Sequence, residues 1–222
     1  MANTDHSVLK INIAPLQTDD LASTHSGLEC NQEKCIGPVI FDPLRRLDKD
    51  DVPAMLMQNG ISAICMHTNL DAAPGGVNDM LSDVLGIQRS GRETFADGCG
   101  RIGTTMPTTT AALAQFCAKT LHSGVKFVDS ARPVTRLAEV SGGGGSYLQA
   151  AIDLGADCLV TGEAAHHIAL LAKQKGVGLV VAGHWGTENT IADVLAQILH
   201  EHFPALDIAH AESDTDPYQY LL

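Results

Sequence analysis

The stretch that decides the fold is DCLVTGEAAHHIALLAKQKGVGLVVAGHWGTE, residues 157–188. Residues 157–161 form an apolar run of strand length, and residues 163–175 follow with the spacing of a helix that ends at a glycine. A second apolar run, 178–182, leads into the helix that we predict over 187–202. Strands and helices that alternate across short glycine-containing loops predict an α/β fold of layered sheets flanked by helices.

The same alternation continues toward the N-terminus. We predict strands at 61–66, 101–106, 125–129 and 137–140, and helices at 52–59, 77–85, 107–122 and 146–154. Functional groups of such sheets collect at the carboxyl ends of strands. The loops that matter most are therefore 67–76, 141–146, 161–167 and 183–188.

Composition limits the class of protein. The 222 residues are 45% apolar and 18% charged, and the formal net charge is −12, which disfavours nucleic acid as a partner. The six cysteines are scattered, so we expect reduced thiols in a cytoplasmic protein rather than a disulfide framework. The N-terminus lacks the apolar run of a signal peptide. No stretch approaches the ~18 apolar residues of a membrane helix, so we expect no membrane contact.

The segment GHWGTE at 183–188 is the first candidate site. His184 follows a predicted strand, and Thr187 is placed to cap the next helix, with Glu188 in its first turn. An imidazole and a carboxylate four residues apart can converge on one zinc, iron or manganese ion. The alternative is a loop histidine beside a glutamate that complements the helix dipole.

The loop HTNLDAAPGG at 67–76 is the second. His67 leaves a predicted strand, and Asp71 follows in a loop made tight by proline and glycine. Its carboxylate could bridge two metal ions, and the alternative is that it caps a turn.

Two further segments lie at predicted strand ends. In TGEAAHH, residues 161–167, Glu163 and one of the two histidines can reach the site for substrate contact or proton transfer, although surface histidines are an equal alternative. The loop SGGGGS, residues 141–146, can offer backbone N–H groups to a phosphate, or can be a tight packing turn. Its possible phosphate-binding residues are Gly143, Gly144 and Ser146.

The chain resembles the NIF-three-like family, whose members are also called dinuclear metal centre proteins or GTP cyclohydrolase type 2 homologues. The resemblance lies in the order of five segments: HTNLDAAPGGVND, GRIG, SGGGGS, TGEAAHH and AGHWGTE. The resemblance covers residues 36–222 and leaves 1–35 as a divergent segment. It implies a two-lobed α/β protomer with the site in the cleft between lobes, a homohexamer, and up to two divalent metal ions per chain. It also implies Asp71 as bridging ligand, His184 and Glu188 as further ligands, and His67 and His167 near the site.

One departure concerns the metal site. Family members usually carry two adjacent histidines where this chain has Ile36 and Gly37, at the start of IGPVIFDPLRRL. Asp71, His184 and Glu188 then remain, and three protein ligands can hold one zinc ion with an open position. His25, Cys30 or Cys35 could replace the missing pair, because imidazole and thiolate both bind such metals.

Three functions follow as hypotheses. The first is a metal-dependent hydrolase for a nucleotide-like or phosphorylated substrate, with His167 as a catalytic proton shuttle. The second is a non-catalytic metal-handling or protein-interaction module with a degenerate metal site. The third, which rests on SGGGGS alone, is a nucleotide-binding α/β domain without metal.

Overall fold

The computed structural model of the chain describes residues 10–13, 52–64 and 66–220. These residues belong to two compact units: 10–13 and 70–220 lie in the larger unit, and 52–64 and 66–69 in the smaller. The expected boundary at 35/36 lies outside the described residues, as do His25, Cys30, Cys35, Ile36 and Gly37. None of the described helices is long and apolar enough to cross a membrane. The described cysteines 99, 117 and 158 are free thiols.

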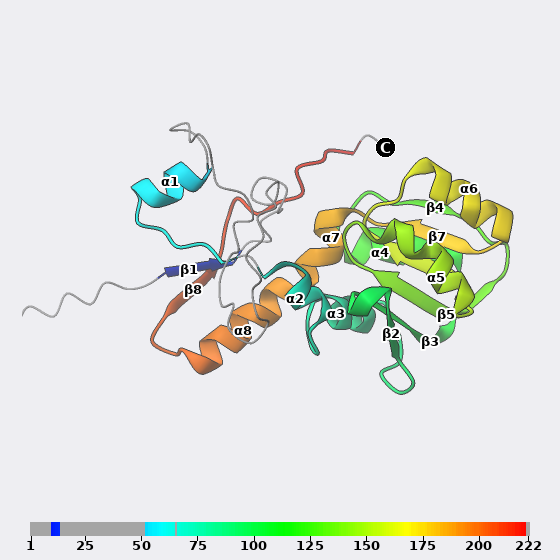
Figure 1. Cartoon of the computed structure of the whole chain (residues 1–222), viewed down its shortest axis with the longest axis horizontal. Helices are drawn as coiled ribbons and strands as arrows, with labels where there is room; N and C mark the ends of the chain where they lie inside the picture. Colours follow the sequence, from blue (N-terminus) through cyan, green and yellow to red (C-terminus); the bar gives the residue numbers. More distant parts are fainter. Residues whose placement is uncertain (1–9, 14–51, 65, 221–222) are drawn as a thin grey trace, which may run out of the picture. The chain divides into compact units, whose positions relative to one another are not determined.

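A six-stranded sheet forms the centre of the larger unit (Figure 1). Its strand order is β2 (Glu93–Phe95), β3 (Gly100–Thr109), β5 (Pro133–Val140), β6 (Cys158–Thr161), β7 (Gly178–Val181) and β4 (Lys126–Val128). Strands β5, β6 and β7 are parallel, whereas β2, β3 and β4 pair antiparallel with their neighbours. The parallel strands β6 and β7 are buried along their whole length, which explains why the sequence shows them as unbroken apolar runs.

Helices cover both faces of this sheet, so the predicted α/β layered fold is confirmed. Helices α5 (Leu148–Asp153) and α6 (His166–Lys175) pack on one face, and α3 (Val77–Val84) and α4 (Thr110–Thr120) on the other. Alternation along each strand divides the core: Leu159 packs in the α5–α6 layer, and its neighbour Val160 in the α3–α4 layer.

The prediction of a helix over 107–122 was wrong at its start, which was placed at Pro107. Pro107 lies inside β3, and α4 begins at Thr110 after Thr109, whose side chain accepts the N–H of Ala112 at 3.2 Å. The β3–β5 register shifts between Thr104 and Thr108. A proline, which has no N–H to donate, is tolerated in a sheet at such an irregularity.

The prediction of a strand at 61–66 was also wrong for its described residues. The helix α1 (Val52–Gln58) precedes this run as expected, but residues 61–64 and 66 adopt no regular structure. The next element is the helix α2 (His67–Ala72) where a loop was expected. Both His67 and Asp71 therefore lie on a short helix, and His67 begins it with φ +42°.

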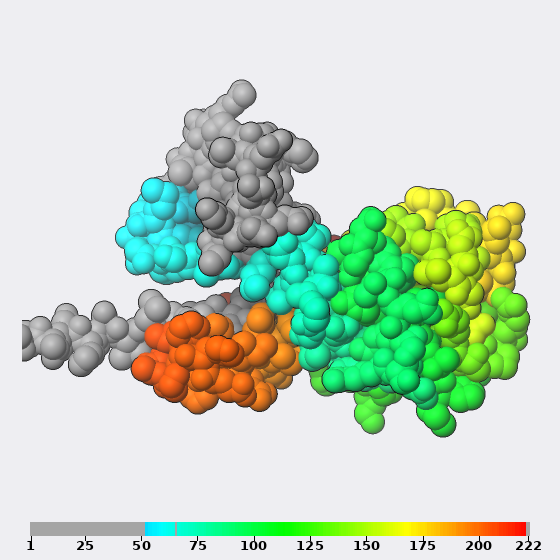
Figure 2. Space-filling model, turned by 60° about the horizontal axis from the view of Figure 1, so that its bottom comes forward, coloured from blue at the N-terminus to red at the C-terminus, as the bar shows by residue number. Residues whose placement is uncertain are grey.

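The C-terminal part departs from one long helix over 187–202. It consists of α7 (His184–Glu188), a 3-10 turn (Asn189–Ile191) and α8 (Ala192–His202), followed by β8 (Asp207–His210), which pairs in parallel with β1 (Lys10–Ile13). Ala192 is the only buried residue of α8. In the space-filling view of Figure 2, the orange surface of α8 is separate from the green surface formed by strands β2 and β3 and their neighbours. Further 3-10 turns are Ala96–Gly98 and Gly144–Tyr147.

Candidate metal centre and adjoining cavity

Three loops meet where the parallel strands end. The carbonyl of Gly142, after β5, accepts the Thr161 hydroxyl at 3.2 Å and the Glu163 N–H at 2.8 Å. The N–H of Gly183, after β7, donates to the Gly162 carbonyl at 3.1 Å. These bonds join the segments after β5, β6 and β7, and confirm that the loops at 141–146, 161–167 and 183–188 gather at one edge of the sheet.

His184 is the centre of this edge. Its Nε2 lies 3.0 Å from Glu188 Oε1, and its Nδ1 lies 3.1 Å from Glu163 Oε1. The pair His184 and Glu188 spans one turn of α7, while Glu163 reaches across from the loop after β6. The His184 and Glu188 side chains are 32% and 27% exposed, so solvent and small ligands can reach them.

Thr187 does not cap a helix, contrary to expectation, because it lies within α7. Its buried hydroxyl donates to the carbonyls of Gly183 and His184, both at 2.9 Å, and accepts the N–H of Gly142 at 3.0 Å. This side chain fastens the histidine turn to the glycine loop.

The glycine at position 142 is required by close approach. Its φ is +56°, and a Cβ there would lie 2.3 Å from Glu188 Oε1 and 2.9 Å from His184 Nε2. The loop therefore passes directly against the atoms that would hold a metal ion, and a side chain would displace them.

The hydrogen bond with Glu188 raises the pKa of His184 to about 9, and the bond with Glu163 adds to this rise, while burial opposes it. The two carboxylates together outweigh the cost of burying an imidazolium. His184 is therefore held as a cation at neutral pH unless another cation takes its place.

Asp71 reaches this edge through an intermediary. The side chain of Asn78, fully buried at the start of α3, donates to the Asp71 carbonyl at 3.0 Å and accepts the Ser141 N–H at 2.9 Å. Among the described residues, however, no three His, Cys, Asp or Glu side chains form a ready ligand set. The structure brings His184 and Glu188 together and ties the Asp71 backbone to their loop, without completing the predicted set.

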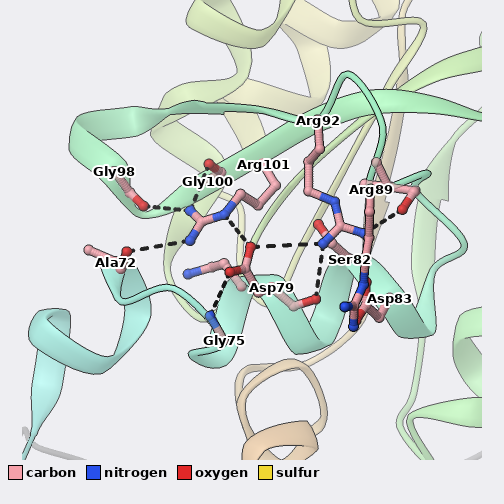
Figure 3. A network of polar contacts seen from close by, with 12 residues as sticks. Ala72, Gly75, Asp79, Ser82, Asp83, Arg89, Arg92, Gly98, Gly100 and Arg101 are labelled. Carbon is pink, nitrogen blue, oxygen red and sulfur yellow. Dashed lines mark hydrogen bonds and ion pairs between the residues drawn. The ribbon is translucent and has the colours of Figure 1, made fainter.

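A network of arginines fixes the turn that follows Asp71 (Figure 3). The guanidinium of Arg101, 2% exposed, bonds Asp79 at 2.7 Å, the Gly98 carbonyl at 2.6 Å and the Ala72 carbonyl at 3.4 Å. Asp79 in turn accepts the N–H of Gly75 at 2.7 Å. The end of α2 is thus joined to β3 and α3 by bonds from a nearly inaccessible side chain.

A cavity of about 930 Å³ opens beside His184. Its polar lining comes from Lys126, Ser146, Glu163, His167 and His184, and two tyrosines of the C-terminal segment, Tyr218 and Tyr220, complete it. Gly143 and Ser146 line the cavity, and their phosphate-binding role stays a prediction. Gly144 instead is buried, with no room for a Cβ beside Val140 and Thr161.

The two histidines of α6 point to different places. His167 lines the large cavity, and His166 lines a smaller one of about 190 Å³ beside Phe127. Of the two, the structure thus places only His167 at the cavity beside His184. The catalytic role of His167 stays a prediction, as does the near-site role of His67, which lies in the smaller unit.

Lys126, Tyr218 and Tyr220 were missed by sequence reasoning. Trp185 Nε1 donates to Asp214 at 2.8 Å and joins the C-terminal segment to α7, and within the segment the Tyr220 hydroxyl donates to Asp216 at 2.9 Å. The sequence offers no periodic signal for these contacts. The cluster DPYQY, which places two tyrosines after a turn-forming pair, was the available hint.

Comparison with known proteins agrees with this architecture. The chain is 28% identical to the GTP cyclohydrolase 1 type 2 homolog of Streptococcus pneumoniae over 198 residues, covering 82% of this chain and 75% of the relative. It is 30% identical to the protein NIF3 homolog of Schizosaccharomyces pombe, covering 81% and 73% of the two chains. The crystal structure of Staphylococcus aureus protein SA1388 superimposes with a TM-score of 0.72 at 26% identity, over 83% of this chain and 78% of the other.

The family model described as Duf34/NIF3 (NGG1p interacting factor 3) matches residues 37–217. This range includes all of the strand-end loops described above. The chain therefore belongs to the Duf34/NIF3 family.

Proposed function

We propose that this protein binds a divalent metal ion through His184 and Glu188, with Asp71 as third ligand, and hydrolyses a nucleotide-like or phosphorylated substrate. The observation that carries the proposal is the 3.0 Å separation of His184 Nε2 and Glu188 Oε1. Two ligand atoms that each bind one zinc ion at about 2.1 Å, at roughly 90–110°, lie about 3.0–3.4 Å apart. The mixed nitrogen and oxygen donors fit zinc, iron or manganese.

The position of Asp71 supports its inclusion. Its backbone is two hydrogen bonds away, through Asn78, from the loop that touches His184 and Glu188. Two ions per chain would need further ligands. The positions of the family's usual histidine pair, Ile36 and Gly37, and the possible substitutes near them lie outside the described residues.

A divalent ion bound here supplies Lewis acidity toward a phosphoryl or similar electrophilic centre. The residues that line the cavity would contact the substrate and transfer protons. Lys126 offers a cation to an anionic substrate, Ser146 a hydroxyl, and the half-exposed ring of Tyr220 a surface on which a base can lie. His167 lines the same cavity and is the proposed proton shuttle. Some relatives are named GTP cyclohydrolase 1 type 2 homologs, which agrees with a nucleotide-like substrate.

Metal content and affinity test the metal site. The purified protein is expected to bind Zn²⁺ or Mn²⁺ in a chelator competition, and His184→Ala and Glu188→Gln are each expected to weaken binding at least tenfold. His200→Ala, on the exposed part of α8, is the matched control and should bind as the wild type. Equal affinity of wild type and His184→Ala would refute the site.

Substrate class is tested with guanosine monophosphate, guanosine and inorganic phosphate as probes in the metal-loaded protein. We expect the nucleotide to bind most tightly, and Lys126→Ala to weaken the nucleotide but not the nucleoside. A loss of both to the same extent would remove the anion-binding role of Lys126.

A non-catalytic metal-handling or interaction role is the second candidate. The observation in its favour is that the described residues hold no complete three-ligand set. A screen of phosphate-ester and nucleotide hydrolysis separates the two. Hydrolysis abolished by His184→Ala in a folded protein supports the enzyme, whereas metal binding without turnover supports the second candidate. Nucleotide binding that is insensitive to a chelator would favour a metal-independent module.

Hexameric assembly is a further proposal, which rests on family membership. Light scattering coupled to size-exclusion chromatography would give about six times the mass of 23.4 kDa if it holds. A cytoplasmic location remains a proposal from the scattered cysteines, and fractionation of cells tests it.

A further inference from the structure

The backbone of Glu163 is fixed on both sides by the glycine loop. Its N–H donates to the Gly142 carbonyl at 2.8 Å, and its own carbonyl accepts the Gly145 N–H at 3.0 Å. Gly162, just before it, lies so close that a Cβ would be 2.8 Å from the Cα of His184. The side chain of Glu163 thus starts from a rigid point directly beside the histidine.

Two different carboxylates occupy the two ring nitrogens of His184. Glu163 Oε1 lies at Nδ1 and Glu188 Oε1 at Nε2, on opposite sides of the ring. A neutral imidazole has one N–H and one lone pair, and the partner of one nitrogen decides which nitrogen keeps the proton. Both carboxylates can only accept, so the metal-free imidazolium donates to both, and a divalent ion beside Glu188 would replace the proton on Nε2 while Glu163 keeps the proton on Nδ1.

We propose that Glu163 is a positioning residue of the metal site, which holds His184 in the tautomer and ring orientation that present Nε2 to a divalent ion beside Glu188. This inference rests on the proposed metal site and names a residue outside its ligand set. A carboxylate that accepts the second N–H of a histidine ligand raises its basicity and fixes its ring.

The two glutamates are not interchangeable in this arrangement. Glu188 is one turn away on the same helix as His184, at the nitrogen that it shares with the proposed ion. Glu163 comes from a different loop and contacts the nitrogen that faces away from Glu188, so a metal ion at Nε2 leaves its hydrogen bond in place. Its side chain is 57% exposed, so replacing it removes little packing.

The test compares Zn²⁺ affinity, by competition with a chromophoric chelator, in the wild type, Glu163→Ala, Glu163→Gln and the control Glu201→Gln. Loss of such a carboxylate typically lowers metal affinity about 10–100-fold, and we expect this for Glu163→Ala. Glu163→Gln keeps a carbonyl acceptor for Nδ1–H and should lose less. Glu201 is exposed on α8 and accepts a hydrogen bond from Gln197 of the same helix, so its variant should match the wild type.

A second readout separates positioning from a general structural effect. In the zinc-loaded wild type, imidazole ¹⁵N shifts are expected to show His184 protonated at Nδ1 and bound through Nε2. In Glu163→Ala this single state should give way to exchange between states, while the thermal unfolding temperature of the metal-free protein stays close to that of Glu163→Gln.

The outcomes distinguish this inference from the function on which it rests. A wild type that binds no Zn²⁺ overturns the proposed metal site and the role of Glu163 together. A wild type that binds, with Glu163→Ala within twofold of it and an unchanged ¹⁵N signature, overturns the role of Glu163 alone.

Discussion

The side chain of Asn78 joins Asp71 to the glycine loop: it donates to the Asp71 carbonyl at 3.0 Å while it accepts the N–H of Ser141 at 2.9 Å. Asn78 is fully buried, so its amide contacts these two backbone groups out of reach of solvent. These two hydrogen bonds couple the helix that carries Asp71 to the loop that contacts His184 and Glu188.

The first prediction concerns this coupling. Asn78→Ala leaves the buried N–H of Ser141 without this partner and removes the bond to the Asp71 carbonyl, and should lower the free energy of unfolding by about 1–3 kcal/mol. Denaturation in urea measures it. Ser146→Ala, at an exposed position of the same loop, is the control. A change below about 0.5 kcal/mol, within the range of ordinary surface substitutions, would show that the amide does not couple these segments.

The second prediction uses two neighbouring glycines. Gly142→Ala places a Cβ 2.3 Å from Glu188 Oε1 at a residue with φ +56°, whereas Gly143 has φ −79° and nothing within 4 Å of an added Cβ. Gly142→Ala should therefore lower the unfolding temperature and weaken metal binding at least tenfold, and Gly143→Ala should do neither. Thermal denaturation and chelator competition measure the two effects, and similar behaviour of both variants would contradict the proposed crowding.

Local spacing made part of this site predictable. His184 and Glu188 are four residues apart, so any helical turn at GHWGTE brings them together, even though the turn begins earlier than expected. The contact of Glu163 with His184 follows from the adjacency of β6 and β7, whose carboxyl ends share one edge. The sequence indicated that these loops lie at the same edge of the sheet, but it did not indicate which side chains come into contact there.

Other features had no local signal. In the local sequence, Pro107 resembles a helix start. The register shift that accommodates it in β3 depends on pairing with the distant strand β5, so the neighbouring residues give no sign of it. The apolar run at 61–66 has strand length, yet Ile61 and Ile64 are 56% and 64% exposed, and periodicity alone cannot separate such runs from strands. The bond of Trp185 with Asp214 spans 29 residues without any pattern between them.

The third prediction is a pH dependence of the metal-free protein. The hydrogen bond with Glu188, assisted by Glu163, raises the pKa of His184 to about 9 from an ordinary value of 6.5. Below pH 6.5 the imidazole is protonated in both folded and unfolded chains, and the stabilisation by its carboxylate partners is complete. Between pH 6.5 and 9 the unfolded chain loses this proton while the folded chain keeps it, so stability falls as pH rises.

Unfolding temperatures measured in a chelator from pH 6 to 9.5 should therefore decline more steeply for the wild type than for His184→Gln. The difference between the two proteins should shrink toward pH 9.5. Parallel pH profiles would mean that the carboxylates do not stabilise an imidazolium at this position.

The fourth prediction concerns Glu139, a fully buried residue of β5 whose Oε1 accepts the Ser82 hydroxyl at 2.9 Å and whose Oε2 has no partner. Burial raises the pKa of Glu139 well above its ordinary value, although Ser82 and the nearby Arg101 and Arg92 act against this. Above pH 4.5 the unfolded chain releases the proton and the folded chain retains it, so the acid costs stability at neutral pH.

Glu139→Gln keeps the shape and the acceptor for Ser82 while removing the ionisation. We expect it to raise the free energy of unfolding at pH 7 by about 1 kcal/mol or more, because a tenfold change in proton affinity corresponds to about 1.4 kcal/mol, and to have little effect near pH 4. Glu93→Gln, in the exposed pair with Arg136, is the control for removing a carboxylate. Destabilisation by Glu139→Gln at pH 7 but not at pH 4 would instead mean that the folded protein holds an ionised Glu139 against Arg101 and Arg92.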